Sequence, residues 1–256
     1  MIPLETQISL TKNLIGTYMA IAKGISGTES ISGNGWTGVI NAFAHPICNF
    51  AICDNTDDLD APELAKYARS RHFFNVYVAR YDDHHRANVR LDRAGFQRVY
   101  ALAQMSCSKS PVGTQGILRL APTAMDRKRV ADFMISQFFS TQTASVRDKI
   151  AQATVQASEL ELYHLVADQI RERPVAAVML HRTQGVLGLY NLCVSMPYRS
   201  QGLGSSLVFA VELLSVQERV ILGLQCDPSL AAWYETLGME QVGTVDVYGL
   251  QKGPRL

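Results

Sequence analysis

The sequence predicts an α+β protein of two domains that repeat one arrangement of helices and strands. Apolar strands alternate with amphipathic helices through the second half, and the first half repeats the order in which that half ends. Between them, Ser106 to Gly116 is rich in Ser, Gly, Pro and Thr and lacks an apolar pattern. We therefore expect one domain at residues 1–110 and another at residues 116–256.

The first half has fewer clear elements. Ala61 to Arg71 has helical periodicity, and Phe73 to Ala79 is apolar enough for a strand. Leu91 to Val99 then combines a helix end, a stop at Gly95 and the start of a strand.

The second half begins with an alternating strand at Ile117 to Ala121. The amphipathic segment Ala124 to Phe139 predicts a helix, and Lys149 to Asp168 predicts one or two more helical stretches. Pro174 ends that run, because proline cannot continue a helix, and Val175 to Leu180 predicts a strand.

The remaining elements alternate regularly. Strands are expected at Val186 to Val194, Arg219 to Cys226 and Gln241 to Leu250, and helices at Ser205 to Leu214 and Ser229 to Leu237. Tyr234 to Val242 repeats the helix end, glycine stop and strand start of Leu91 to Val99. A period this long indicates duplicated domains, since solenoid repeats run to about 20–50 residues.

An anion site is predicted where the strand ending at Val194 meets the helix from Ser205. The connecting segment, Arg199-Ser200-Gln201-Gly202-Leu203-Gly204, places glycines where a phosphate can approach unpaired helix amides. The matching place in the first half, Cys53 to Asp60, is rich in carboxylates that would repel a phosphate. Only the second domain should bind a nucleotide.

Composition excludes several classes of partner. The 24 basic and 23 acidic residues give a net charge of +1, so we expect neither nucleic acid nor membrane as a partner. The cysteines are scattered and should be reduced packing thiols. Asp82 to His85 has metal-ligating types, but adjacent side chains seldom converge on one ion, so no metal is expected. The chain start lacks secretory features, which favours the cytoplasm.

Two segments carry a resemblance to a known family. Leu192 to Gly204 resembles motif A of the GNAT acyltransferases, which has Arg or Gln, two residues, Gly, one residue, and Gly or Ala. Asp227 to Met239 resembles the second GNAT signature, with a tyrosine before a Leu-Gly-aromatic ending. The likeness covers Ile117 to Lys252, and Trp36 to Met105 as a degenerate copy. It implies two GNAT-like domains, each with a mixed, mostly antiparallel sheet flanked by helices.

The resemblance also implies acetyl-coenzyme A as cosubstrate and names its contacts. Arg199 would add charge or brace the phosphate loop. Asp227 replaces the usual asparagine and, when ionised, can only accept hydrogen bonds. The implied binding residues are Leu192, Cys193, Val194, Arg199, Ser200, Gln201, Gly202, Leu203, Gly204, Ser205 and Asp227.

In this family the strand at Leu192 to Val194 carries a bulge that separates it from Arg219 to Cys226. The gap would admit the pantetheine arm, and a backbone N–H near Cys193 or Val194 would polarise the thioester carbonyl. Cys193 itself is expected to pack rather than to act as a nucleophile. A dinucleotide interpretation is weaker, since its third glycine would fall at Leu207.

Tyr234 is the implied catalytic residue, protonating the departing thiolate, with Tyr198 and Tyr190 as weaker candidates. Where some family members carry a strand glutamate, this chain has Gly188. The general base therefore stays open between a water chain and four residues that are candidates by type alone. These are Glu159, Glu161, His164 and His181.

We expect an N-acetyltransferase that moves an acetyl group to a primary amine by direct attack in a ternary complex. The acceptor should be a small-molecule amine rather than a protein, with the first domain walling its pocket. The resemblance implies that Ala124 to Phe139 and Lys149 to Ile170 flank the acceptor cleft. The alternative is a non-catalytic acetyl-coenzyme A sensor or regulatory module. A structural pseudoenzyme dimerised through its first half is a third interpretation, and oligomeric state, including a homodimer, stays open.

Overall fold

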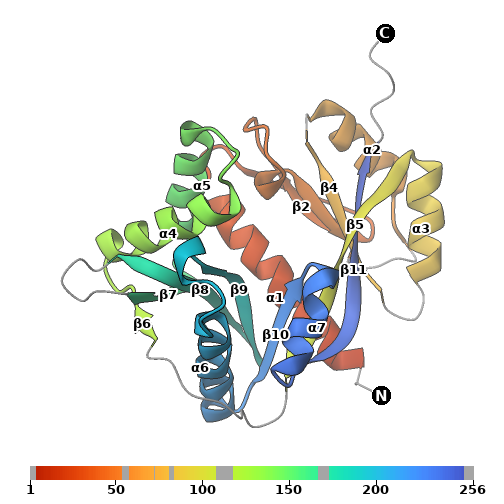
Figure 1. The fold of residues 1–256 in the computed structure, drawn as a ribbon. Helices are drawn as coiled ribbons and strands as arrows, with labels where there is room; N and C mark the ends of the chain where they lie inside the picture. The colour runs from red at the N-terminus through yellow and green to blue at the C-terminus, as the bar shows by residue number, and fades with distance from the viewer. Residues whose placement is uncertain are drawn as a thin grey trace.

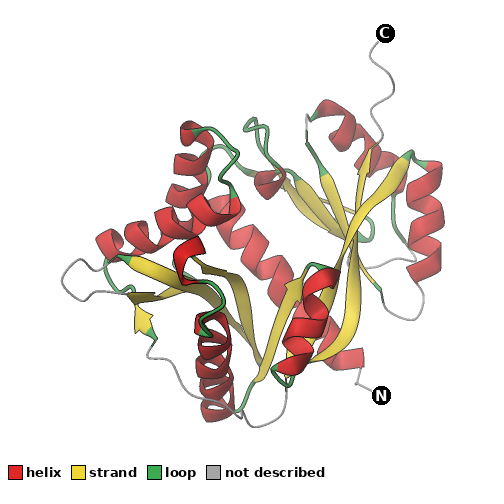
Figure 2. Cartoon of the chain, in the orientation of Figure 1, coloured by secondary structure: helices red, strands yellow, loops and turns green. Residues whose placement is uncertain are grey.

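The computed structural model describes residues 4–53, 58–71, 73–80, 84–107, 118–166 and 173–250. Its strands form one 11-stranded sheet in the order β1-β2-β3-β4-β11-β5-β10-β9-β8-β7-β6. Figure 1 shows this sheet running through the whole molecule, with helices along it in both halves, and Figure 2 separates helices from strands by colour. The described fold is α+β and its sheet is mostly antiparallel, as the sequence predicts.

The described part of the first half contains three helices, five strands and a short 3₁₀ turn. They are α1 (Leu4–Lys23), β1 (Glu29–Gly33), β2 (Trp36–Ile40), η1 (Pro46–Cys48), β3 (Phe50–Cys53), α2 (Ala61–Ser70), β4 (Asn75–Ala79), α3 (His84–Arg93) and β5 (Phe96–Cys107). The helix at α2, the strand at β4 and the glycine stop at Gly95, whose φ is 93°, confirm the predictions made there.

In the described residues, the second half contains the elements that the sequence predicts, the unpredicted strand β7 and two short 3₁₀ turns. They are β6 (Arg119–Leu120), α4 (Ala124–Phe138), α5 (Ala144–Gln156), β7 (Leu160–Val166), β8 (Pro174–Thr183), β9 (Val186–Val194), η2 (Met196–Tyr198), α6 (Leu203–Glu218), β10 (Ile221–Cys226), η3 (Pro228–Leu230), α7 (Ala231–Thr236) and β11 (Glu240–Leu250).

The helical prediction for Lys149 to Asp168 is wrong beyond Gln156. Residues from Leu160 form β7, which pairs antiparallel with β8 and buries alternate side chains such as Leu160 and Leu162. Arg127 helps end the preceding helix, because its guanidinium donates to carbonyls that include those of Val155 and Ala157. Residues 167–168 lie outside the described part of the chain.

The duplication is visible in the strand pairing. In the first half, β1 pairs antiparallel with β2, β2 pairs antiparallel with β3, and β3 pairs parallel with β4. In the second half, β7, β8 and β9 pair antiparallel, and β9 pairs parallel with β10. The loop after β3 therefore corresponds to the loop after β9, which is where the phosphate motif lies.

Within this single sheet, the last strand of each half pairs with strands of the other half. The strand β11 pairs with β4 on one side and β5 on the other, while β5 also pairs with β10. The expected boundary between residues 1–110 and 116–256 therefore separates β5 from strands to which it is hydrogen-bonded in the sheet. Most of the proposed linker, residues 108–116, lies outside the described residues.

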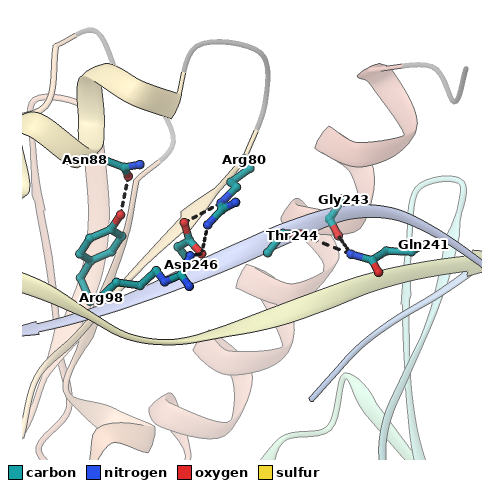
Figure 3. A network of polar contacts seen from close by, with 8 residues as sticks. Arg80, Asn88, Arg98, Gln241, Gly243, Thr244 and Asp246 are labelled. Carbon is teal, nitrogen blue, oxygen red and sulfur yellow. Dashed lines mark hydrogen bonds and ion pairs between the residues drawn. The ribbon is translucent and has the colours of Figure 1, made fainter. Parts of the chain in front are cut away.

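A buried carboxylate fixes β11 in the first half. Asp246 is 1% exposed and accepts bidentate hydrogen bonds of 2.6 and 2.9 Å from Arg80, at the end of β4. Arg98 on β5 approaches the same carboxylate at 3.4 Å (Figure 3). Tyr248, further along β11, donates to Asn88 of α3 at 2.5 Å. A strand late in the sequence is thus held by charged and polar groups of the first half.

Alternate residues of the second-half strands face two different cores. Ala177 and Met179 of β8 belong to a cluster with α1, α4 and α5, which also includes Phe50 and Val247. Val178 and Leu180 face a separate cluster around α6 and α7. The helix α1 from the chain start therefore packs against the second-half sheet. Among the described helices, none is long and apolar enough to cross a membrane.

Candidate active site

One cavity collects most of the residues that the sequence analysis selected. It has a volume of about 620 Å³ and lies where β9, α6 and α7 meet. Its walls are formed by Gln137, Phe138, Leu192, Cys193, Val194, Tyr198, Arg199, Ser200, Gly202, Leu203, Gly204, Ser205, Leu230, Trp233 and Tyr234. Of Tyr234 and the implied cosubstrate contacts, only Gln201 and Asp227 are absent from these walls.

The N-terminus of α6 presents unpaired amides to this cavity. Gly202 is the N-cap in a left-handed conformation with φ 78°, and it has no side chain with which to cap the helix. The first intrahelical bond runs from Ser206 N–H to the Gly202 carbonyl at 2.9 Å. The amides of Leu203, Gly204 and Ser205 therefore have no helical acceptor, and the helix dipole favours an anion beside them.

The space in front of these amides is open. A Cβ added at Gly202 would meet no atom within 4 Å, and one at Gly204 would lie 3.5 Å from the Trp233 ring. Glycine thus keeps this cradle clear at the point where a bound phosphate must touch the backbone. The residues fit the diphosphate of a coenzyme A thioester.

Arg199 braces the loop that leads to α6. Its Nε donates to the Val194 carbonyl at 3.0 Å, across the turn between β9 and the helix. Ser200 takes a φ of 60°, and the Gln201 side chain donates to the Pro197 carbonyl at 3.0 Å. The Gln201 side chain is thus directed to its own loop, while its neighbours line the cavity.

The parallel strands β9 and β10 separate beside the cavity. They pair from Val186 opposite Ile221 as far as Leu189 opposite Leu224, and their pairing stops there. The register of β9 against β8 shifts between Tyr190 and Cys193, and Asn191 has a φ of 50°. This is a β-bulge, and the predicted separation of the strands is present. Cys193 and Val194 line the cavity just past it.

Tyr234 projects from α7 into the same cavity. It is 5% exposed, and its ring packs edge-on against Trp233 at a centroid distance of 4.6 Å. Burial, with a smaller contribution from Cys226, raises the pKa of the Tyr234 phenol. The phenol is therefore a proton donor at neutral pH rather than a phenolate.

Cys193 has the properties of a packing residue. It is 8% exposed and belongs to the core cluster shared by the two halves. Burial raises the pKa of its thiol to about 12, so the nucleophilic thiolate is scarce at neutral pH. The remaining cysteines, Cys48, Cys53, Cys107 and Cys226, are also buried thiols.

Asp227 caps the short turn η3. Its Oδ1 accepts from the Ser229 amide at 2.9 Å and from the Ser229 hydroxyl at 2.6 Å. These bonds lower the pKa of the Asp227 carboxyl. This geometry engages one oxygen of a carboxylate that does not line the cavity, so its contact with a cosubstrate stays a prediction.

The candidate general bases lie elsewhere. Glu161 pairs with Arg182 and accepts from the Tyr163 hydroxyl at 2.8 Å. Burial lowers the pKa of both His164 and His181, and Glu159 is exposed. None of these four residues is among the cavity walls.

Gly188 stands where some family members carry a strand glutamate, and the space beside it is occupied by a side chain of α1. A Cβ added at Gly188 would overlap the side-chain oxygen of Asn13. That oxygen accepts from the Tyr190 hydroxyl at 2.7 Å, while the Asn13 amide donates to the His181 carbonyl at 3.0 Å and to the Thr183 hydroxyl at 2.9 Å. Tyr190, a weaker donor candidate by sequence, is thus held by the first-half helix.

Four wall residues were not singled out individually from the sequence, namely Gln137, Phe138, Leu230 and Trp233. Trp233 is adjacent to Tyr234 and lies within the second signature, which is a usable signal. Gln137 and Phe138 lie at the end of the predicted helix Ala124 to Phe139, which the family resemblance implies flanks the acceptor cleft. Asp82 and Asp83 lie outside the described residues, and elsewhere in the described chain no group of three or more His, Cys, Asp or Glu could hold a metal ion.

Comparison with known families identifies the part of the chain that contains this cavity. Residues 128–239, which include α6, both separated strands and α7, match the acetyltransferase (GNAT) family. This segment is a GNAT domain. No curated protein sequence matches the chain.

Solved structures extend the likeness to the whole chain. A GCN5-related N-acetyltransferase from Kribbella flavida has 14% identity and a TM-score of 0.64, covering 94% of this chain and 96% of that one. A tandem GNAT protein from the clavulanic acid biosynthesis pathway has 13% identity and a TM-score of 0.61, covering 92% and 88%. A putative GNAT acetyltransferase from Novosphingobium aromaticivorans has 13% identity and a TM-score of 0.56, covering 87% and 92%. At these identities the likeness establishes a tandem GNAT fold.

Proposed function

We propose that this GNAT-family acetyltransferase transfers an acetyl group from acetyl-coenzyme A to a primary amine by direct attack in a ternary complex. The observation that carries the proposal is the single cavity joining the unpaired amides of α6, the separated strands and Tyr234. An anion cradle, a slot for an extended chain and a buried proton donor are the three parts that such a transfer needs.

The cradle binds and orients the cosubstrate. The amides of Leu203, Gly204 and Ser205 hold its diphosphate, and Arg199 keeps the loop closed around it. Acetyl-coenzyme A supplies an acetyl group activated as a thioester. The slot past Leu189 and Leu224 directs that group toward Cys193 and Val194, whose backbone can polarise its carbonyl.

Tyr234 donates the proton that the departing thiolate needs. Its raised pKa keeps the phenol protonated, and its place in the cavity wall puts it beside the slot. The amine must lose a proton to attack, and no carboxylate or imidazole is among the cavity walls. A water chain is therefore the proposed route for that proton.

The acceptor is proposed to be a small amine. Gln137 and Phe138, at the end of α4, form the part of the cavity wall that does not come from the two signatures. A near-neutral chain with net charge +1 offers no general attraction for a strongly charged macromolecule. We also propose a cytoplasmic location on the basis of the sequence.

The substitution Tyr234→Phe tests the mechanism. A general acid contributes about 10²–10⁴-fold, and because a thiolate is a fair leaving group we expect a fall in kcat near the lower end, about 100-fold. Affinity for acetyl-coenzyme A should stay within about twofold, since the ring is kept. The measurement is thiol release over a panel of small amines, with Tyr198→Phe, in the same wall, as the matched control.

A non-catalytic sensor is the second candidate, favoured by the absence of a base among the cavity walls. It predicts binding of acetyl-coenzyme A with no thiol release for any amine, and no effect of Tyr234→Phe on binding. Turnover that depends on Tyr234 would exclude it.

A further inference from the structure

A second cavity, with a volume of about 630 Å³, lies between the two halves of the chain. It shares no wall residue with the cofactor cavity. Its walls come from the end of α1, from the loop after β2 and from one face of α5. They include Lys23, Asn41, Phe43, Lys149, Gln152 and Gln156.

The charge on these walls has one sign. Lys23 and Lys149 are the charged wall residues, and no carboxylate is among the walls. In the described part of the chain neither ammonium group has an ion-pair partner; the Lys149 ammonium lies 5.0 Å from the centroid of the Phe43 ring. Two unpaired cations around one hollow lower the energy of an anion placed between them.

The α5 face adds neutral donors. Lys149, Gln152 and Gln156 are spaced three and four residues apart, so their side chains project from the same face of the helix. The side-chain amides of Gln152 and Gln156 are exposed and can each donate two hydrogen bonds. Ammonium groups from α1 and α5 and two amides are the donor set that carboxylate or phosphate groups require.

The walls are held in place by their own hydrogen bonds. Asn41 is 5% exposed and its amide donates to the Ser26 carbonyl at 3.0 Å and the Thr28 hydroxyl at 2.8 Å. The Thr28 hydroxyl bonds the carbonyls of Ala22 and Ile25, so the end of α1 does not offer these oxygens to a ligand. Gly24 lies so close to Ala153 of α5 that a Cβ there would be 2.5 Å from the Ala153 carbonyl oxygen. The hollow is therefore largely preformed.

We propose that this inter-half cavity binds a small polyvalent organic anion, whose carboxylate or phosphate groups bridge Lys23 of α1 and Lys149 of α5. The anion would connect the first half to the GNAT domain at a place separate from the cofactor cavity. Because it would bind the folded chain and not the unfolded one, it would also raise the unfolding temperature.

The experiment titrates the full chain with citrate and, separately, with inorganic phosphate at constant ionic strength, by calorimetry. We expect saturable binding of at least one probe, and a loss of affinity of about tenfold or more in Lys23→Gln/Lys149→Gln. The control is Lys12→Gln/Lys66→Gln, which removes the same charge from exposed positions of α1 and α2 outside the cavity. The control should bind as the unsubstituted chain does.

The two probes distinguish the source of the negative charge. Citrate binding alone indicates a carboxylate ligand, and phosphate binding alone indicates a phosphorylated one. Absence of binding by both probes, or equal affinity in the cavity variant and the control, would overturn the proposal. Both cavity lysines are exposed, so the variant should fold, and unfolding temperatures without added anion verify this.

Discussion

Glu212 is a buried carboxylate without a counter-charge. It lies on the face of α6 that packs against the sheet, is 1% exposed, and forms no ion pair with another described residue. Burial raises its pKa from 4.5 to about 7, partly offset by the Cys107 thiol. Folding therefore favours the protonated form, and the folded state binds more protons than the unfolded state between these two pKa values.

The sign of the pH dependence follows from that difference. Stability contributed by neutral Glu212 is present below about pH 4.5 and is lost as pH rises through about 7. We expect Glu212→Gln, which cannot ionise, to raise the unfolding temperature at pH 8 by about 2–4 °C, the shift that 1 kcal/mol gives in a chain of this size. The gain should shrink at pH 5.

Scanning calorimetry at both pH values makes this test, with Glu235→Gln as the control because Glu235 is exposed. An equal gain at pH 5 and pH 8, or no gain at pH 8, would show that Glu212 is not the titrating group.

At the scale of the element, α1 stabilises the β8–β9 hairpin of the GNAT domain. Asn13 bonds groups on both strands, and Thr17 bonds the His181 ring at 2.9 Å. Tyr190, which donates to Asn13, immediately precedes the bulge at Asn191. The helix therefore supports the strand segment at which β9 separates from β10.

Replacement of Asn13 by Ala should destabilise the fold. It leaves the Tyr190 hydroxyl and the His181 carbonyl without their side-chain partner inside the protein, at about 1–3 kcal/mol for each buried group. Urea unfolding should show this loss, and Lys12→Ala, at an exposed site on α1, should unfold like the original chain.

Element predictions succeeded where local pattern determines structure. Asp60 and Thr123 cap α2 and α4 as sequence rules require, and Gly202 begins α6. The helix α1 was not predicted, since its buried face mixes Asn13, Thr11 and Thr17 with leucines, and those polar groups are explained only by distant partners. The error at β7 has the same origin, because a short apolar segment becomes a strand through pairing with β8.

At the scale of the molecule, the two halves exchange their last strands. The strand β11 was predicted at its observed place in the sequence, but its partners are β4 and β5. Periodicity indicates which residues form a strand and which face is buried, whereas the neighbour depends on contacts such as Asp246 with Arg80. The cavity between β9, α6 and α7 was largely predictable because most of its residues lie in two continuous segments.

The exchange also gives the first half a structural role. Removing residues 1–110 would leave β10 and β11 without β5 and would remove α1 from the shared core. Loss of activity in such a deletion would follow from unfolding. The idea that the first half walls the acceptor pocket is better tested by substitutions in the full chain.

The amides at the start of α6 are proposed to hold the diphosphate of acetyl-coenzyme A. Hydrogen–deuterium exchange of the full chain, with and without saturating acetyl-coenzyme A, tests it at those amides. We expect exchange at Leu203, Gly204 and Ser205 to slow by at least about tenfold, with Gly202→Asp, which adds a carboxylate to the open cradle, abolishing the effect. Unchanged exchange at these three amides under saturating cosubstrate would contradict the account.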